Sequence, residues 1–152
     1  MATQTLSSPP SKARRVSGPV LLYDGTCGFC AASVQFLLRH ERVHTLRFAP
    51  LDGAFAATVR ARHPALDGVD SLVWVEADGS DGAGAVLVRS AAVLRAAQYL
   101  GGVWTLARAA ALLPRSLRDA AYDLIARHRH RILPKQDQCF LPPPEVRGRF
   151  LE

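Results

Sequence analysis

Short apolar runs alternate with helical patterns of apolar residues in the first hundred residues of the chain. Val20–Tyr23 is a continuous apolar run that ends at Asp24 and Gly25, the pattern of a buried strand followed by a turn. Over Cys27–His40 the apolar residues recur at helical spacing, and Asp24 or Thr26 is expected to cap this helix. One face of the predicted helix carries Cys30, Val34, Leu37 and Leu38.

The segments that follow predict three more strands and a short helix. Thr45–Ala49 alternates apolar and polar residues, as a half-buried strand does, and Ala54–Arg62 has a helical pattern. Leu72–Val75 and Ala85–Val88 are apolar runs typical of strands. The Asp- and Gly-rich stretch between them is too short for a crossover helix, so these two strands are expected to be antiparallel neighbours.

The second half of the chain is mainly helical in pattern. Ser90–Leu100 is expected to be a helix that Ser90 caps and that the following glycine pair ends. Further helices are predicted over Val103–Leu113 and from Ser116 to about Arg131, the latter with a capping box between Ser116 and Asp119. The apolar stripe of this last helix consists of Leu117, Ala120, Ala121, Leu124 and Ile125. The end of the chain, with four prolines, is expected to be irregular.

The predicted order of elements defines an α/β fold with a mixed four-stranded sheet and flanking helices. Val20–Tyr23 and Leu72–Val75 are expected near the centre of the sheet because their apolar runs are unbroken. We expect one domain over residues 19–152, with an added helical C-terminal region from about residue 103. Residues 1–18, rich in Ser, Pro and basic residues, are expected to form a disordered tail.

The formal net charge of +6 lies at the two ends of the chain. Residues 1–18 and 127–152 each carry +3, whereas residues 19–126 contain ten Arg and ten acidic residues. A neutral central domain argues against specific recognition of nucleic acid. No apolar run reaches the length of about 18 residues that a transmembrane helix needs. The first 18 residues lack the apolar core of a secretory signal, so the expected location is the cytoplasm.

Three cysteines in a reducing compartment indicate redox or metal chemistry rather than structural disulfides. Cys27 and Cys30 are separated by two residues, a spacing that brings both sulfurs together across the first turn of a helix. Cys27 is expected to be an exposed nucleophile, because the N-terminus of a helix stabilises a thiolate. Cys30 lies on the apolar stripe and is expected to be a sheltered, protonated thiol that resolves a mixed disulfide.

The segment from Asp24 to Cys30 resembles the motif of the DCC family of thiol-disulfide oxidoreductases, which is named for its Asp and two Cys residues. The resemblance covers most of residues 19–150. It includes Ser90–Leu94, Gly101–Trp104, Pro114–Asp119, Tyr122 and Cys139. The resemblance implies a thioredoxin-like fold and dithiol–disulfide exchange at Cys27 and Cys30. Such exchange needs no bound cofactor, and its partner would be a protein or small molecule with a disulfide or thiol.

Two positions near the cysteine pair leave alternatives open. Asp24 is either a turn residue, as Asp-Gly pairs often are, or a proton acceptor beside the cysteines. Ordinary thioredoxins have a cis-proline just before the third strand, where this chain has Val69, Asp70 and Ser71. The backbone opposite the cysteine pair must therefore be shaped in some other way.

Cys139, near the end of the chain, is either an inert thiol or a third redox thiol that folds back to the pair. Zinc binding by Cys27, Cys30, Cys139 and one histidine is an alternative function, although the second half of the chain lacks a second pair of closely spaced ligands. A non-catalytic interaction domain with basic ends is another alternative. The basic run Arg127–Arg131, with its two histidines, is interpreted as the polar end of a helix.

Overall fold

A mixed four-stranded sheet forms the centre of the molecule, as predicted. The computed structural model describes residues 18–76, 84–133 and 141–151. The strand order is β2-β1-β3-β4. The strands are β1 (Val20–Tyr23), β2 (Arg47–Pro50), β3 (Val73–Val75) and β4 (Val86–Val88). β2 is parallel to β1, whereas β3 is antiparallel to both β1 and β4, so the predicted antiparallel pair is confirmed.

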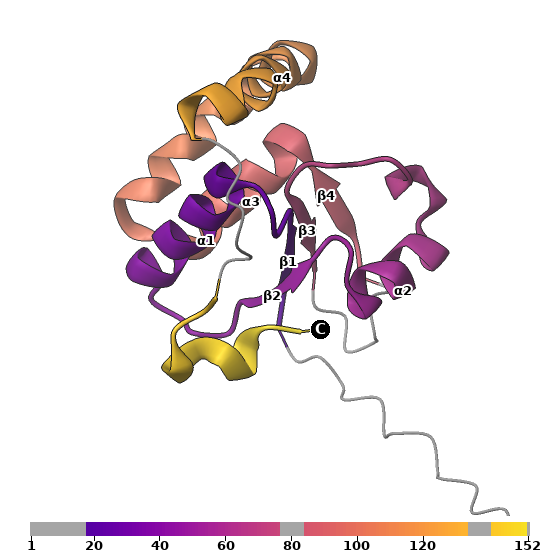
Figure 1. Cartoon of the computed structure of the whole chain (residues 1–152). Helices are drawn as coiled ribbons and strands as arrows, with labels where there is room; N and C mark the ends of the chain where they lie inside the picture. Colours follow the sequence, from indigo (N-terminus) through magenta and orange to yellow (C-terminus); the bar gives the residue numbers. More distant parts are fainter. Residues whose placement is uncertain (1–17, 77–83, 134–140, 152) are drawn as a thin grey trace, which may run out of the picture.

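Helices cover both faces of the sheet, an arrangement consistent with a thioredoxin-like fold. α1 (Gly28–His40) and α3 (Arg89–Leu100) pack on one face, and α2 (Ala54–Arg62) covers the other together with the short 3-10 helix η1 (Pro64–Leu66) (Figure 1). β1 has all four residues buried because alternate side chains enter the two cores. Leu21 contributes to the core with α1, and Leu22 contributes to the core with α2.

The connection from β4 to α3 differs from the predicted one. The helix begins at Arg89, a non-glycine residue with φ of +54°, so Ser90 is inside the helix and does not cap it. The Ser90 hydroxyl instead donates a hydrogen bond to the Asp119 carboxylate. The helix ends as predicted at the glycine pair, where Gly101 and Gly102 both have positive φ angles.

The C-terminal helical region contains two elements. η2 (Gly102–Leu112) is a 3-10 helix, whereas the apolar pattern predicted an α-helix. α4 (Arg115–Ile132) is close to the predicted helix but begins after Pro114 without a side-chain cap. The predicted capping box is wrong because Asp119 accepts a hydrogen bond from Ser90 and pairs with Arg115. None of the described helices combines the length and the apolar character needed to cross a membrane.

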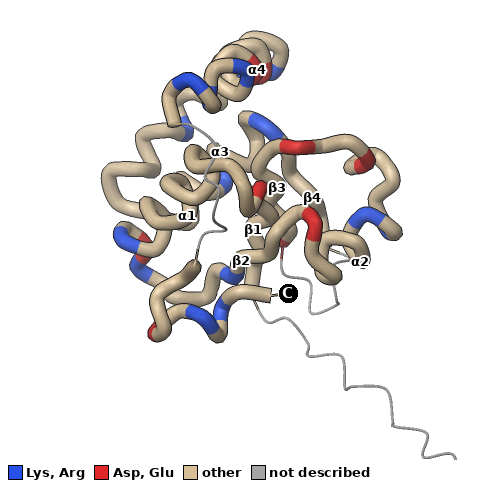
Figure 2. Tube along the Cα trace, in the orientation of Figure 1, with Lys and Arg blue, Asp and Glu red and all other residues tan. Residues whose placement is uncertain are grey.

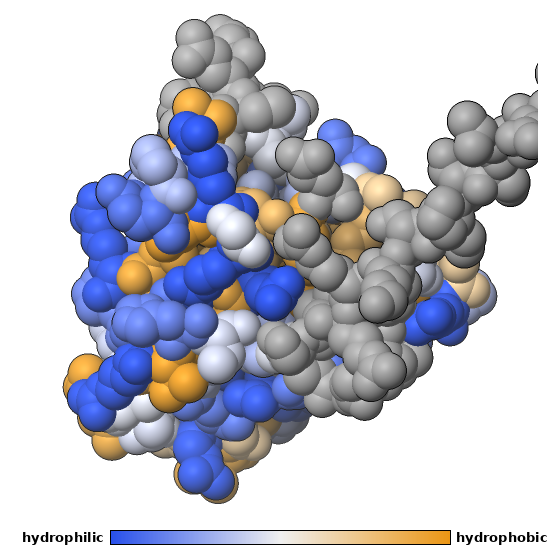
Figure 3. Space-filling model, turned by 90° about the horizontal axis from the view of Figure 1, so that it is seen from below, coloured by the Kyte–Doolittle hydropathy of each residue, from blue (hydrophilic) through white to orange (hydrophobic). Residues whose placement is uncertain are grey.

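The end of the chain lies against the edge of the sheet rather than being irregular throughout. η3 (Pro144–Arg149) is a 3-10 helix, and Phe150 then forms a parallel bridge with Phe48 of β2 (Figure 1). The Leu151 N–H donates to the Phe48 carbonyl at 2.7 Å. In the view from below, hydrophilic and apolar areas lie side by side on the surface of the described residues (Figure 3). A segment that was expected to be irregular therefore contains a short helix and a backbone bridge to the edge strand of the sheet.

A buried polar cluster attaches this end to the domain. The Glu41 side chain is only 1% exposed, and the Arg149 guanidinium binds both of its carboxylate oxygens, one of them at 2.7 Å. Arg149 also donates to the Leu46 carbonyl at 2.8 Å. The Tyr99 hydroxyl of α3 donates to Glu41 at 3.2 Å, so the cluster joins α1, α3 and the chain end.

Charged residues of both signs are distributed around the described part of the chain (Figure 2). Arg89 pairs with Asp123, and Arg95 pairs with Glu76. This distribution fits the neutral central region that the sequence indicates.

Candidate functional site

The cysteine pair lies at the junction of β1 and α1, where the sequence predicted it. β1 ends at Tyr23, a turn follows, and Cys27 is the last residue before the helix, with extended backbone angles. The Cys27 N–H donates to the Asp24 carbonyl at 3.3 Å and closes the turn. Cys30 lies in the first turn of α1, and both cysteines are free thiols.

Both sulfur-bearing side chains are buried, which corrects the expectation of an exposed Cys27. Cys27 is 1% exposed and Cys30 is 2% exposed. The sequence places Cys27 at a helix terminus, where exposure is common, but this terminus adjoins a fully buried strand. Cys27 therefore packs in the same core cluster as Leu21 and Tyr23. A substrate reaches this sulfur only when neighbouring side chains move.

The thiol of Cys30 resists ionisation. Burial raises the pKa of Cys30 to about 12, and the charge of Cys27 and a hydrogen bond with its sulfur act in the same direction. A hydrogen bond from the backbone of Asp24 and the positive charge of Arg129 oppose this rise without cancelling it. Cys30 therefore keeps its proton at neutral pH, as expected for a sulfur on the apolar stripe.

The Asp24 side chain forms the turn that leads into α1. Its Oδ1 accepts hydrogen bonds from the backbone N–H and the hydroxyl of Thr26, at 2.9 and 2.8 Å. This arrangement is an Asx turn, which fits the turn interpretation of the Asp-Gly pair. The backbone of Asp24, rather than its carboxylate, makes the contact with the Cys30 sulfur.

Two residues of α4 complete the surroundings of Cys30. Arg129 is buried, and its guanidinium donates to the carbonyl of Asp70 at 2.8 Å and to the Asp70 carboxylate at 3.1 Å. Burial raises the pKa of Tyr122, while hydrogen bonds with Ser71 and with the backbone of Leu72 partly offset this. The loop before β3, where the chain departs from thioredoxins, is therefore held by a buried arginine.

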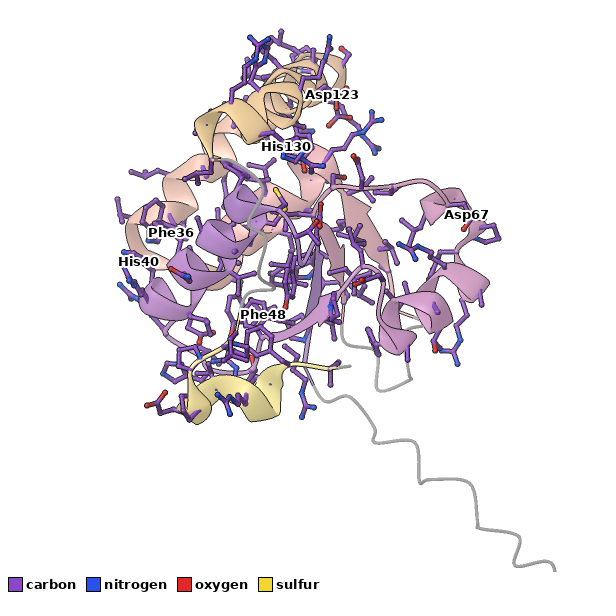
Figure 4. All side chains as sticks on the ribbon, viewed as in Figure 1. Phe36, His40, Phe48, Asp67, Asp123 and His130 are labelled. Atoms are coloured by element: carbon purple, nitrogen blue, oxygen red, sulfur yellow. The ribbon has the colours of Figure 1, made fainter. Side chains whose placement is uncertain are left out.

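Sequence reasoning missed Arg129 as part of this site. It grouped Arg129 with its basic neighbours as the polar end of a helix, and only Arg129 of that group is buried. His130, the next residue, projects from the same end of α4 (Figure 4), and Arg129 Nε donates to its Nε2 at 3.4 Å. The seven-residue interval between Tyr122 and Arg129 places both on one helix face, which was the signal available in the sequence.

The remaining predictions for the site involve Cys139, which lies outside the described residues. Its possible role as a third redox thiol stays a prediction, and so does the zinc alternative that includes it. Among the described residues, no group of three or more Cys, His, Asp or Glu side chains is arranged to hold a metal ion.

Comparison with known proteins adds a family context to this geometry. The sequence model of the DCC1-like thiol-disulfide oxidoreductases matches residues 21–135, a range that includes both cysteines of the pair, Tyr122 and Arg129. An uncharacterized protein of Bacillus subtilis (strain 168), YuxK, is 30% identical over 138 residues, which cover 90% of this chain and 96% of that protein. A chloroplastic DCC family protein of Arabidopsis thaliana is 30% identical over 125 residues, which cover 81% of this chain and 69% of that protein. No solved structure matches the chain.

Proposed function

Because the chain belongs to the DCC1-like thiol-disulfide oxidoreductase family, we propose that it is an enzyme whose redox centre is the pair Cys27 and Cys30. The observation that carries the proposal is the asymmetry of the pair at the start of α1. Burial and the contact with Cys27 raise the pKa of Cys30 and keep it protonated, and Cys27 lies at the N-terminus of α1, so we assign Cys27 as the attacking sulfur.

In the proposed reaction, the Cys27 thiolate attacks one sulfur of a substrate disulfide. A bond forms between the Cys27 sulfur and that sulfur, and the other half of the substrate leaves as a thiolate. Cys30 then loses its proton and attacks the Cys27 sulfur, and the second half of the substrate leaves. The substrate gains two electrons, and the enzyme ends as a Cys27–Cys30 disulfide. A reduced thiol of the cytoplasm would restore the dithiol by the reverse exchange.

The order of the two steps follows from the causes of the high pKa of Cys30. Two of those causes, the charge of Cys27 and the hydrogen bond with its sulfur, exist only while Cys27 is free. When Cys27 enters a mixed disulfide both disappear, whereas the backbone of Asp24 and the charge of Arg129 still favour the Cys30 thiolate. Cys30 therefore becomes easier to ionise at the stage when it must attack. We also propose that Asp24 serves the reaction through this backbone contact.

A single-turnover assay with 5,5′-dithiobis(2-nitrobenzoate) tests the proposal. Because the chain has three cysteines, the assay uses a Cys139→Ser background in which only the pair can react. The intact pair should release two equivalents of coloured thiolate in two kinetic steps. Adding Cys30→Ser should leave one equivalent released and a stable mixed disulfide on Cys27. Adding Cys27→Ser should nearly abolish the reaction, because the protonated, buried Cys30 is a poor nucleophile.

Equal reaction of the two single variants would contradict the proposed roles. Restoring Cys139 then tests the third thiol separately. If Cys139 takes part, peptide mapping of the oxidised protein should find it in a disulfide with Cys27 or Cys30. If Cys139 takes no part in the exchange, it should release at most one equivalent independently of the pair and leave both kinetic steps unchanged.

A further inference from the structure

A large apolar cavity lies between the helices on the α1 face of the sheet. Its volume is about 620 Å³, and its walls come from α1, α3, η2 and α4. Leu21 of β1 and Leu72 form part of its lining. This volume is within the range of about 300–1,000 Å³ that small-molecule sites occupy.

Small side chains leave this space open. The walls carry Ala92, Ala96 and Ala97 on α3, and Ala107 and Ala110 on η2. Trp104 of η2 and Phe36 of α1 also line the cavity and make an edge-to-face contact, with ring centroids 5.0 Å apart. Figure 4 shows Phe36 and His40 on the side of α1 that faces η2. The aromatic contact keeps η2 attached while the alanines beside it leave the interior unfilled.

The apolar residues of η2 and α4 in the cavity walls are more exposed than apolar residues usually are. η2 consists largely of apolar residues, yet none of its residues is buried. On α4, Leu117 and Ile125 line the cavity and are about half exposed. Apolar surfaces that face one another across a hollow gain free energy when an apolar molecule fills it.

The cavity wall contains one charged side chain, Arg118 of α4. No carboxylate in the part of the chain that the structure describes pairs with it, and its Nε atom is buried without a hydrogen-bond partner there. Arg118 also lies in the first turn of α4, where the helix dipole favours a negative charge. An occupant with an apolar body and one anionic head would satisfy both parts of the wall.

We propose that this cavity is a binding site for an aliphatic carboxylate of the fatty-acid type, with its chain among the alanines and its carboxylate on Arg118. The site is distinct from the redox pair, since neither Cys27 nor Cys30 lines the cavity. Phe29, which lies between the two cysteines in the sequence, and Tyr122 line the cavity and separate it from the redox pair. Because neither cysteine contacts the proposed ligand, the binding proposal does not rest on the proposed redox function.

Calorimetric titration of the full-length protein with octanoate, decanoate and dodecanoate, each below its micelle concentration, tests the site. Binding should saturate at one equivalent, and the affinity should rise about fourfold for each added methylene. Trp104 gives a second readout, because the other tryptophan, Trp74, is fully buried. Decanoate should protect Trp104 from acrylamide quenching.

Matched variants distinguish binding in this cavity from non-specific hydrophobic binding elsewhere on the protein. Ala121→Trp places a large ring in the cavity wall and should abolish binding, whereas Ala120→Trp, at the neighbouring position outside the lining, should not. Arg118→Gln should weaken decanoate about tenfold and leave 1-decanol unchanged, because only the carboxylate uses the charge. The Cys27→Ser/Cys30→Ser double variant should bind as the wild type does, which keeps this test independent of the redox proposal.

Three results would overturn the proposal. The first is no saturable binding of dodecanoate to the wild type. The second is equal binding by Ala121→Trp and Ala120→Trp when circular dichroism shows both to be folded. The third is a concentration-dependent dimer that dodecanoate does not dissociate, because a second copy of the chain would then cover the cavity.

Discussion

The two halves of the C-terminal region attach to the domain in opposite ways. Residues 102–132, in η2 and α4, are rich in apolar side chains, yet Arg129 is their only buried residue. Residues 144–151 include two arginines and a glutamate, yet a buried ion pair and a backbone bridge fix them to the sheet. Apolar composition alone therefore does not bury a segment, because burial also requires a complementary surface for the segment to pack against.

Glu41→Gln breaks the stronger of these two attachments and should have the largest effect on stability. The variant keeps the shape of the side chain but leaves the partly buried Arg149 guanidinium without its carboxylate. Removing one partner of a buried ion pair costs about 3 kcal/mol in the free energy of unfolding. Urea unfolding measures the loss. Glu76→Gln is the matched control, since its pair with Arg95 is more exposed and contributes about 1 kcal/mol or less.

The stability of the wild type and of Glu41→Gln can also be compared as a function of pH. Burial alone would raise the pKa of Glu41, but hydrogen bonds from Arg149, His44 and Tyr99 outweigh it and hold the pKa below its ordinary value. A carboxyl whose pKa is lower in the folded state stabilises the fold above the unfolded value, about 4.3. The stability difference between wild type and Glu41→Gln should be complete at pH 7. It should shrink as the pH falls below about 4; an unchanged difference there would contradict this assignment.

Phe150→Ala tests the apolar part of the same attachment and should have the next largest effect. Phe150 stacks on Phe48 with ring centroids 5.1 Å apart and meets the edge of Tyr23 at 6.3 Å. Because Phe150 is only partly buried, we expect a loss of about 2 kcal/mol, below the full range for core phenylalanines. Phe36→Ala, which loses the contact with η2, should cost about half as much. A larger loss for Phe36→Ala would reverse the comparison between the two halves.

Arg129→Met removes the buried contact between α4 and Asp70 and should change the rate of the proposed exchange reaction. The positive charge of Arg129 favours the Cys30 thiolate, so its removal should slow the second, resolving step severalfold. The first step should be unchanged. Arg127→Met, on the same helix and exposed, is the control. Equal slowing of both steps would mean that the variant disturbs the site as a whole.

Leu112→Gln should have the smallest effect. Leu112 is 89% exposed at the end of η2, and a surface substitution of this kind changes the free energy of unfolding by no more than about 0.5 kcal/mol. Thermal unfolding should give a midpoint close to that of the wild type. A loss of several degrees would mean that η2 packs more closely than its exposed residues indicate.

Periodicity in the sequence predicted the sheet and its main helices because those elements bury the apolar residues that define the pattern. Val20–Tyr23, Cys27–His40 and Ala54–Arg62 appear close to where they were expected. The position of the cysteine pair could be predicted for the same reason, since it depends only on a strand followed by a helix.

Contacts between distant segments account for what the sequence did not predict. The sequence predicted that Asp119 caps its own helix, but its carboxylate accepts a hydrogen bond from Ser90, 29 residues earlier. Arg129 acquires its place beside Cys30 only when α4 packs against the loop at Asp70. The bridge between Phe48 and Phe150 joins β2 to the end of the chain, and no local pattern encodes such a pairing.

That bridge has a consequence for how molecules of this protein meet one another. β2 is an edge strand, and an uncovered edge offers its backbone hydrogen-bonding groups to the strands of other chains. At Phe48 the carbonyl is already used by the Leu151 N–H, and the Phe150 ring lies over the Phe48 ring. The opposite edge, β4, offers only three residues. By covering β2, the chain end thus hinders edge-to-edge aggregation. A protein shortened before residue 144 should therefore form β-sheet aggregates more readily, even where it still folds.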